Sequence, residues 1–177
     1  MTRFSARRLF HRRTLAAAGA LALPMLGAGC DQRAAGPASA PEVGYTLLDG
    51  KPAHLSDLRG RVVLVNFWAT SCASCVAEMP ALVDTWQRFR SRGFETLAVA
   101  MQYDPPARVA QFAETRGLPF GVVIDNTGAV ARAFGDVRVT PTSFVVDRRG
   151  RIAQRYEGAP DFAQLHRLLD DLLAQRA

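Results

Sequence analysis

An apolar segment that leads directly into two closely spaced cysteines is the feature that most constrains this fold. Residues 62–68 are almost continuously apolar, which predicts a strand buried on both faces of a sheet. Cys72 and Cys75 follow, and apolar residues then recur at helical spacing over residues 79–89. Cys72 therefore falls where a strand gives way to a helix N-terminus, whose free N–H groups and dipole favour a thiolate. Two intervening residues allow the sulfurs to join in a short disulfide, so the pattern predicts a redox switch.

Strands and helices alternate along most of the remaining chain. The pattern predicts, in order, a hairpin around residues 45–50, a short helical turn at 55–60, a strand at 95–100, a helix at 107–116, a strand at 122–124, a short helix at 129–134, a second hairpin at 142–156 and a closing helix from Asp161. Three arginines near the turn of the second hairpin, Arg148, Arg149 and Arg151, are expected to be solvated. This order predicts an α/β sheet covered on both faces.

The positive charge of the chain is concentrated at its beginning. The formal net charge is +6, and five arginines precede the first acidic residue, Asp31. The rest of the chain is therefore close to neutral. We expect no nucleic-acid binding, because the excess of basic residues belongs to the targeting segment.

Residues 1–30 are interpreted as a signal peptide or as a lipoprotein signal or anchor. A positive stretch ends at Arg13, and the uncharged run 14–29 that follows is short for a comfortable membrane span. The pairs of arginines before this run admit a twin-arginine route as well as an ordinary Sec signal. Residues 31–42 are rich in Ala, Gly and Pro and predict a flexible tether, which leaves residues 43–177 as the folded domain.

Cys30 closes the signal segment as Leu-Gly-Ala-Gly-Cys and resembles the cysteine of a bacterial lipobox. Gly27 departs from that motif, which usually has an apolar residue at this position. Lipidation would consume a thiol that would otherwise be unpaired in an exported protein. An uncleaved anchor and plain cleavage are the alternatives.

Residues 66–80 contain Asn-Phe-Trp-Ala-Thr-x-Cys-x-x-Cys-x-x-Glu-Met-Pro, and residues 139–144 read Val-Thr-Pro-Thr-Ser-Phe. Both strongly resemble the active-site segment and the cis-proline loop of TlpA/ResA-like thiol–disulfide oxidoreductases. The resemblance covers residues 43–173. It implies a thioredoxin-like fold with a mixed central sheet flanked by helices, an N-terminal β-hairpin and a family-type central insertion. The family usually has Trp where this chain has Ser71 and often has Pro where it has Ser74, which puts partner choice and redox potential in question.

Each cysteine has an expected role. Cys72, nearer the exposed end, would attack a substrate disulfide, and Cys75, one turn deeper, would release the substrate by attacking Cys72. The alternative is a structural disulfide or a metal clip. A bridge that closes so short a loop constrains the unfolded chain little, which argues against a purely structural disulfide.

Three further residues complete the candidate site. Glu78 lies on the helical face of Cys75, where it could relay a proton or could simply be an acid favoured by the helix dipole. The resemblance implies the first role, and Asn66 stands where thioredoxin has a buried Asp, which strengthens it. Pro141, if cis, would lay the backbone of Thr140 beside the cysteines for pairing with a substrate segment. A plain turn proline is the alternative.

The resemblance implies a membrane-tethered oxidoreductase in the periplasm or at the outer face of the cytoplasmic membrane, where it would reduce disulfides of exported proteins. We expect no cofactor beyond the Cys72–Cys75 disulfide and no metal. Its implied partners are exported client proteins and a membrane donor of thiols, with cytochrome c maturation or copper-site assembly as the process. A Cu(I) chaperone that uses the same cysteine pair and a disulfide-donating oxidant remain alternatives.

Overall fold

The computed structural model describes residues 38–175. In chain order its elements are β1 (Gly44–Thr46), β2 (Pro52–His54), η1 (Leu55–Leu58), β3 (Val62–Trp68), α1 (Ala73–Phe89), η2 (Arg90–Arg92), β4 (Phe94–Ala100), α2 (Pro106–Arg116), β5 (Gly121–Ile124), α3 (Ala129–Ala133), β6 (Thr142–Val146), β7 (Ile152–Glu157) and α4 (Phe162–Ala174). The predicted order of strands and helices is confirmed, with bounds that differ by one or two residues at some ends.

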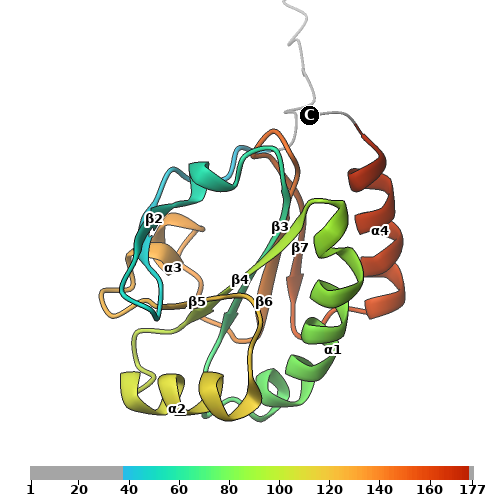
Figure 1. Ribbon diagram of the computed structural model, residues 1–177. Coiled ribbons are helices and arrows are strands. Elements are labelled where there is room, and N and C mark those ends of the chain that lie inside the picture. The colour runs from blue at the N-terminus through green and yellow to red at the C-terminus, as the bar shows by residue number, and fades with distance from the viewer. Residues whose placement is uncertain (1–37, 176–177) are drawn as a thin grey trace, which may run out of the picture. The chain divides into compact units, whose positions relative to one another are not determined.

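The strands of this part of the chain form a central five-stranded sheet in the order β5-β4-β3-β6-β7 and a separate β1-β2 hairpin. β3, β4 and β5 run parallel, whereas β6 is antiparallel to β3 and β7 to β6 (Figure 1). The predicted mixed sheet and N-terminal hairpin are therefore confirmed.

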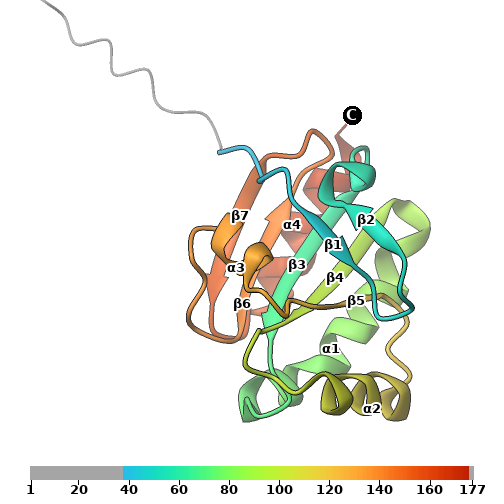
Figure 2. The same ribbon diagram turned by 90° about the vertical axis from the view of Figure 1, so that its left-hand side faces the viewer.

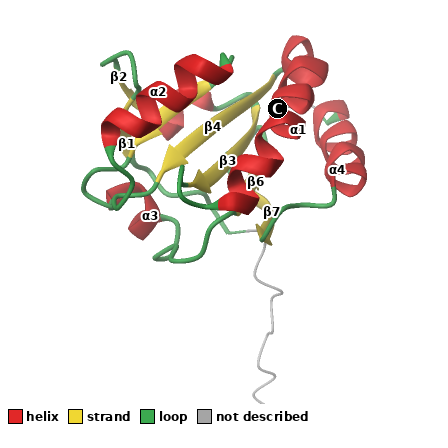
Figure 3. Cartoon of the chain, turned by 90° about the horizontal axis from the view of Figure 1, so that it is seen from below, coloured by secondary structure: helices red, strands yellow, loops and turns green. Residues whose placement is uncertain are grey.

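The two faces of the sheet are covered by different elements. α1 and α4 lie together on one side, and α3 lies on the other (Figure 3). The β1-β2 hairpin covers the same side as α3 (Figure 2). Every residue of β3 is buried, because alternate side chains enter the two cores: Val62, Leu64 and Trp68 pack on the α1 side, and Val63, Val65 and Phe67 on the α3 side.

The helix after the cysteines buries one stripe of its surface. Cys75, Met79 and Leu82 are buried at a helical spacing, and Phe89 ends the helix against the same core. The helix continues through Pro80. Gly93, with φ of 96°, ends the following turn in a left-handed conformation that glycine adopts without a steric cost.

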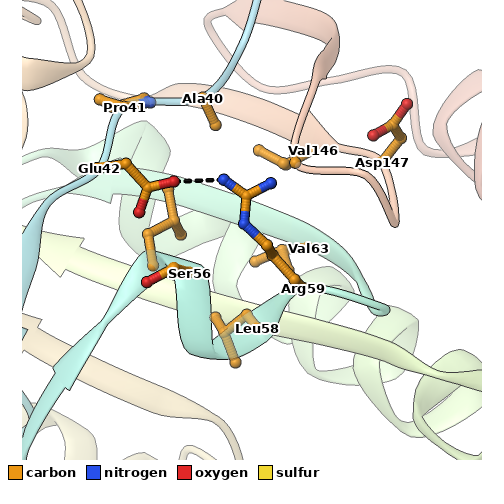
Figure 4. A pocket seen from close by; sticks show the side chains of 11 residues that line it. Ala40, Pro41, Glu42, Ser56, Leu58, Arg59, Val63, Val146 and Asp147 are labelled. Atoms are coloured by element: carbon orange, nitrogen blue, oxygen red, sulfur yellow. Dashed lines mark hydrogen bonds and ion pairs between the residues drawn. The ribbon is translucent and has the colours of Figure 1, made fainter. Parts of the chain in front are cut away.

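The folded domain begins before residue 43. Ser39 forms a β-bridge with Arg151, and the Ala40 N–H donates to the carbonyl of Gly150 over 2.8 Å. Glu42 forms an ion pair with Arg59 beside a small cavity of about 20 Å³ (Figure 4). The domain thus takes up residues 38–42, which composition places in the tether, because their backbone pairs with the β6-β7 turn. The predicted signal, Cys30 and residues 31–37 lie outside the described residues.

Arg148 corrects the expectation of a solvated hairpin turn. It is half-buried, and its guanidinium donates to the carbonyls of Gly60, Arg92 and Leu173 over 2.8, 3.1 and 3.3 Å. One side chain thus holds three segments that are distant in sequence. Local composition could not show this, because every acceptor belongs to another element.

Candidate active site

Cys72 and Cys75 form a disulfide at the N-terminus of α1. Cys72 is the N-cap residue, and the Cys75 N–H donates to its sulfur over 3.2 Å. Cys75 is fully buried, whereas Cys72 is half-buried between the exposed residues Ser71 and Ala73. An incoming thiol or disulfide therefore meets the sulfur of Cys72 first.

A second polar group lies beside the accessible sulfur. The hydroxyl oxygen of Ser74 is 3.4 Å from Sγ of Cys72, and either atom can donate. In the reduced protein this hydroxyl can turn its hydrogen toward a thiolate. The helix dipole and the N–H of Cys75 favour the same charge. The site is built to stabilise a thiolate at Cys72.

The loop that carries Cys72 is fastened to the loop after β4. The backbone N–H and the hydroxyl of Thr70 donate to the two carboxylate oxygens of Asp104, each over 2.6 Å. Asp104 is 3% exposed, and its own N–H donates to the carbonyl of Met101. The carboxylate thus fixes the active-site loop two residues before the nucleophile.

A buried polar cluster drawn from three elements includes Glu78, one helical turn after Cys75. Asn66 on β3 donates through Nδ2 to Oε1 of Glu78 over 2.9 Å and to the hydroxyl of Ser143 on β6 over 3.0 Å. Asn66 faces α1 because it alternates with Val65 and Phe67, which face the opposite core. The cluster therefore follows from the strand period and the β3-β6 register, in which Asn66 lies opposite Ser143.

Glu78 is buried, with 5% of its surface exposed. Burial raises the pKa of Glu78 to about 7, against the lowering effect of the hydrogen bond from Asn66. Its Oε2 has no hydrogen-bond partner among residues 38–175. The carboxyl is therefore poised to gain or lose a proton near neutral pH, one helical turn from Cys75.

The peptide bond between Thr140 and Pro141 is cis. This loop leads into β6, where Thr142 lies opposite Phe67 of β3, so it reaches the same end of the sheet as Cys72. The Thr142 hydroxyl donates to the carbonyl of Val139 over 2.7 Å, and the Gly158 N–H donates to the carbonyl of Pro141 over 2.8 Å. The structure thus brings the predicted residues Thr140 and Pro141 to the active-site edge.

Three residues at this edge were not singled out by the sequence analysis: Tyr103, Asp104 and Ser143. Tyr103 and Asp104 follow the parallel strand β4, whose carboxyl end lies next to that of β3. The carboxyl ends of neighbouring parallel strands meet at one edge of the sheet. Polar or aromatic residues shortly after β4 could therefore have been predicted to lie near Cys72. Ser143 had no such signal, because it became notable only through the β3-β6 register.

Trp68, at the end of β3, has a packing role. It is fully buried, and its ring centroid lies 5.0 Å from that of Phe112 on α2. The indole makes no polar contact with another described side chain that would give it a chemical role.

A metal ion that takes more than two ligands would need further ligands from side chains near the cysteine pair. Among residues 38–175, no group of three or more His, Cys, Asp or Glu side chains is arranged to hold a metal ion. Met79 is near the cysteines in sequence but is 2% exposed and packs in the core. A soft metal at the pair would have the two sulfurs as its ligands from this part of the chain. In the same residues, no helix combines the length and apolar character that crossing a membrane requires.

The fold and the site together define a thioredoxin-like protein with a redox-active disulfide. The Redoxin family model matches residues 35–169. The chain is 36% identical over 134 residues to the thiol–disulfide oxidoreductase ResA of Geobacillus kaustophilus, covering 76% of each chain. It is 37% identical over 120 residues to ResA of Geobacillus thermodenitrificans, covering 68% of each.

The structural comparison agrees. The crystal structure of a thiol:disulfide interchange protein of the thioredoxin family from Chlorobium tepidum matches with a TM-score of 0.71 at 31% identity, covering 78% of this chain and 97% of that one. The protein belongs to the Redoxin family, as a TlpA/ResA-like thiol–disulfide oxidoreductase.

Proposed function

We propose that this oxidoreductase is a membrane-tethered reductant that acts outside the cytoplasm on disulfides of exported client proteins. Cytochrome c maturation or copper-site assembly is the process that its family resemblance favours. The observation that carries the proposal is the asymmetry of the disulfide. Cys72 is accessible at a helix N-terminus, and Cys75 is buried one turn from Glu78.

In the proposed reaction, the thiolate of Cys72 attacks one sulfur of a client disulfide. A mixed disulfide forms, and the other client sulfur leaves as a thiolate. The thiolate of Cys75 then attacks the sulfur of Cys72, which re-forms the Cys72–Cys75 bond and frees the second client sulfur. The client gains two electrons and two protons, and a membrane donor of thiols must reduce the enzyme again.

Glu78 is proposed to serve as the acid–base group for Cys75. A buried thiol must lose its proton before it can attack, and a carboxylate nearby can accept that proton. The position of Glu78 one turn along α1 and its pKa of about 7 support this role. Asn66 and Ser143 hold the carboxyl in place from two other elements.

Thr140 and Pro141 are proposed to line the client site. Their loop leads into β6 at the active-site edge, and Thr140 is half-buried beside the exposed Val139. An extended client segment could pair with the backbone there, as strand-adding ligands do in other proteins. Attachment through the N-terminus, by lipidated Cys30 or by an uncleaved signal, would keep the domain at the membrane surface.

The reduction potential of the full chain tests the direction of the reaction. Equilibration in glutathione or dithiothreitol buffers should give a value near or below about −250 mV for a reductant, whereas about −120 mV would indicate a disulfide donor. Failure to form a reversible Cys72–Cys75 disulfide would contradict the proposal altogether. Copper titration of the reduced protein tests the alternative of a Cu(I) chaperone. Tight stoichiometric binding would favour the chaperone, and the absence of binding would exclude it.

A further inference from the structure

Two of the exposed large apolar side chains gather beside the active-site edge. Within residues 38–175, Tyr103 is 56% exposed, Val139 is 58% exposed and Leu48 is 37% exposed. Val139 directly precedes Thr140, and the hydroxyl of Tyr103 lies 3.4 Å from Oγ1 of Thr140. Leu48, by contrast, lies near the turn of the β1-β2 hairpin. Clustered apolar exposure at a reactive edge indicates a contact surface for a partner.

The position of Tyr103 is fixed with respect to the nucleophile. Its neighbour Asp104 is buried and accepts both hydrogen bonds from Thr70, two residues before Cys72. A ring presented from a fixed backbone loses little freedom when a partner binds. Ser71, the residue before Cys72, is small and polar, so the large exposed apolar side chains found near this edge in the described residues are those of Tyr103 and Val139.

A pocket of about 280 Å³ adjoins Tyr103. Its lining includes Gln102, Arg132, Asp136 and Arg138. The two guanidinium groups outnumber the single carboxylate in this lining, so the pocket carries a net positive charge. Arg138 forms an ion pair with Asp136, to which it donates through both Nε and Nη2, and Arg132 donates through Nη1 to the carbonyl of Thr127 over 2.8 Å. Each guanidinium has five N–H donors, so donors remain for a carboxylate from outside.

We propose that Tyr103, Val139, Arg132 and Arg138, here called the client patch, select the disulfide that the enzyme reduces. The client is an extended segment that carries an apolar or aromatic side chain beside its cysteine and a carboxylate that reaches the pocket. This inference rests on the proposed reductase function, which it deepens by naming the chemistry of the client. Apolar contact supplies affinity, and the arginines supply charge selectivity.

The test uses the full chain, reduced beforehand, and three disulfide probes. Each probe releases the uncharged compound 2-mercaptoethanol when it is reduced. Two are short peptides whose cysteine is in a mixed disulfide with 2-mercaptoethanol. Both have phenylalanine beside the cysteine, and they differ by glutamate or lysine nearby. The third is 2-hydroxyethyl disulfide. Each molecule of reduced protein reacts once: the probe disulfide gains two electrons and two protons and is released as two thiols, and Cys72 and Cys75 are left joined in a disulfide.

The wild-type protein should prefer the glutamate peptide over the lysine peptide. Tyr103→Ala should lower the second-order rate constant for oxidation of the reduced protein by the glutamate peptide about tenfold, and should have a much smaller effect with 2-hydroxyethyl disulfide, which has no side chain for the ring to contact. Tyr103→Phe should keep most of the wild-type rate with the glutamate peptide, because the aromatic ring makes the contact. Arg138→Gln should reduce the preference for glutamate over lysine by about tenfold. Leu48→Ala, which removes an apolar side chain exposed elsewhere, is the matched control and should change neither rate.

Unchanged peptide kinetics in Tyr103→Ala, or equal use of the two peptides by the wild type, would overturn the client patch. An equal loss with the peptide and the small disulfide would also overturn it, because Tyr103 would then act on the loop of Cys72. The proposed function fails separately: in that case the wild-type protein reduces none of the three probes.

Discussion

Asn66 donates a hydrogen bond to Glu78 across 2.9 Å in the interior of the protein, and Glu78 lies one helical turn after Cys75. This bond favours the charged carboxylate, yet burial outweighs it and raises the pKa of Glu78 to about 7. The carboxyl therefore changes its charge in the pH range where thiol–disulfide exchange takes place.

Glu78→Gln should change how stability depends on pH. A carboxyl with a pKa raised from 4.5 to about 7 keeps its proton in the folded state over a range where the unfolded chain has lost it. The folded state therefore loses stability as pH rises from about 4.5 to about 7, by about 3 kcal/mol. Glu78→Gln has no carboxyl at this position and lacks this loss. The free energy of unfolding of the variant, relative to that of the wild type, should therefore increase as pH rises through this window, as denaturant unfolding of the oxidised protein can measure.

The exposed residue Glu114 on α2 offers a matched control for that experiment. Glu114→Gln removes the same formal charge without changing the buried cluster. A difference between wild type and Glu78→Gln that stays constant from pH 4 to pH 8 would show that the pKa of Glu78 is the same in the folded and unfolded states, which contradicts the raised value.

Ser74→Ala should raise the pKa of the Cys72 thiol in the reduced protein. The Ser74 hydroxyl lies 3.4 Å from the sulfur and can donate to the thiolate but gives less help to the neutral thiol. We expect a rise of about one pKa unit or less, measured from the pH dependence of alkylation by iodoacetamide. Ser71→Ala, on the other side of Cys72, is the control. Equal shifts in both variants would assign the effect to general polarity.

Thr70 and Asp104 should show strongly coupled effects on stability. Thr70→Val removes one of the two hydrogen bonds to the buried carboxylate and should cost about 1 kcal/mol. Asp104→Ala leaves the Thr70 N–H without its partner and should cost about 2–3 kcal/mol. The double variant should lose less than the sum of the two, as denaturant unfolding can measure. Additive losses would mean that the two side chains act independently.

Cys75→Ser should trap the intermediate of the exchange reaction. Cys72 can still attack a disulfide, but the buried sulfur that would release the partner is gone. A mixed disulfide with the peptide probes should therefore accumulate and be visible by mass spectrometry under non-reducing conditions. Cys72→Ser should give none. Accumulation in Cys72→Ser would reverse the roles of the two sulfurs.

The sequence by itself determined the features that depend on near neighbours. The apolar run of β3, the N-terminus of α1 at Cys72, and the cap of α4 at Asp161, whose carboxylate accepts from the Gln164 N–H, each depend on residues a few positions apart. Local patterns of this kind specify strands, helices and their ends, because the backbone groups involved lie within one turn. The placement of Glu78 on the face of Cys75 followed from the same period.

Only the tertiary structure decided what surrounds those features. The raised pKa of Glu78 depends on burial and on Asn66, and Asn66 also donates to Ser143, which is 77 positions away. Thr70 donates to Asp104 across 34 positions, and Ala40, which precedes β1, pairs with Gly150. Burial and hydrogen-bond partners are properties of segments brought together by sheet order and register, and a pattern within one segment does not contain them.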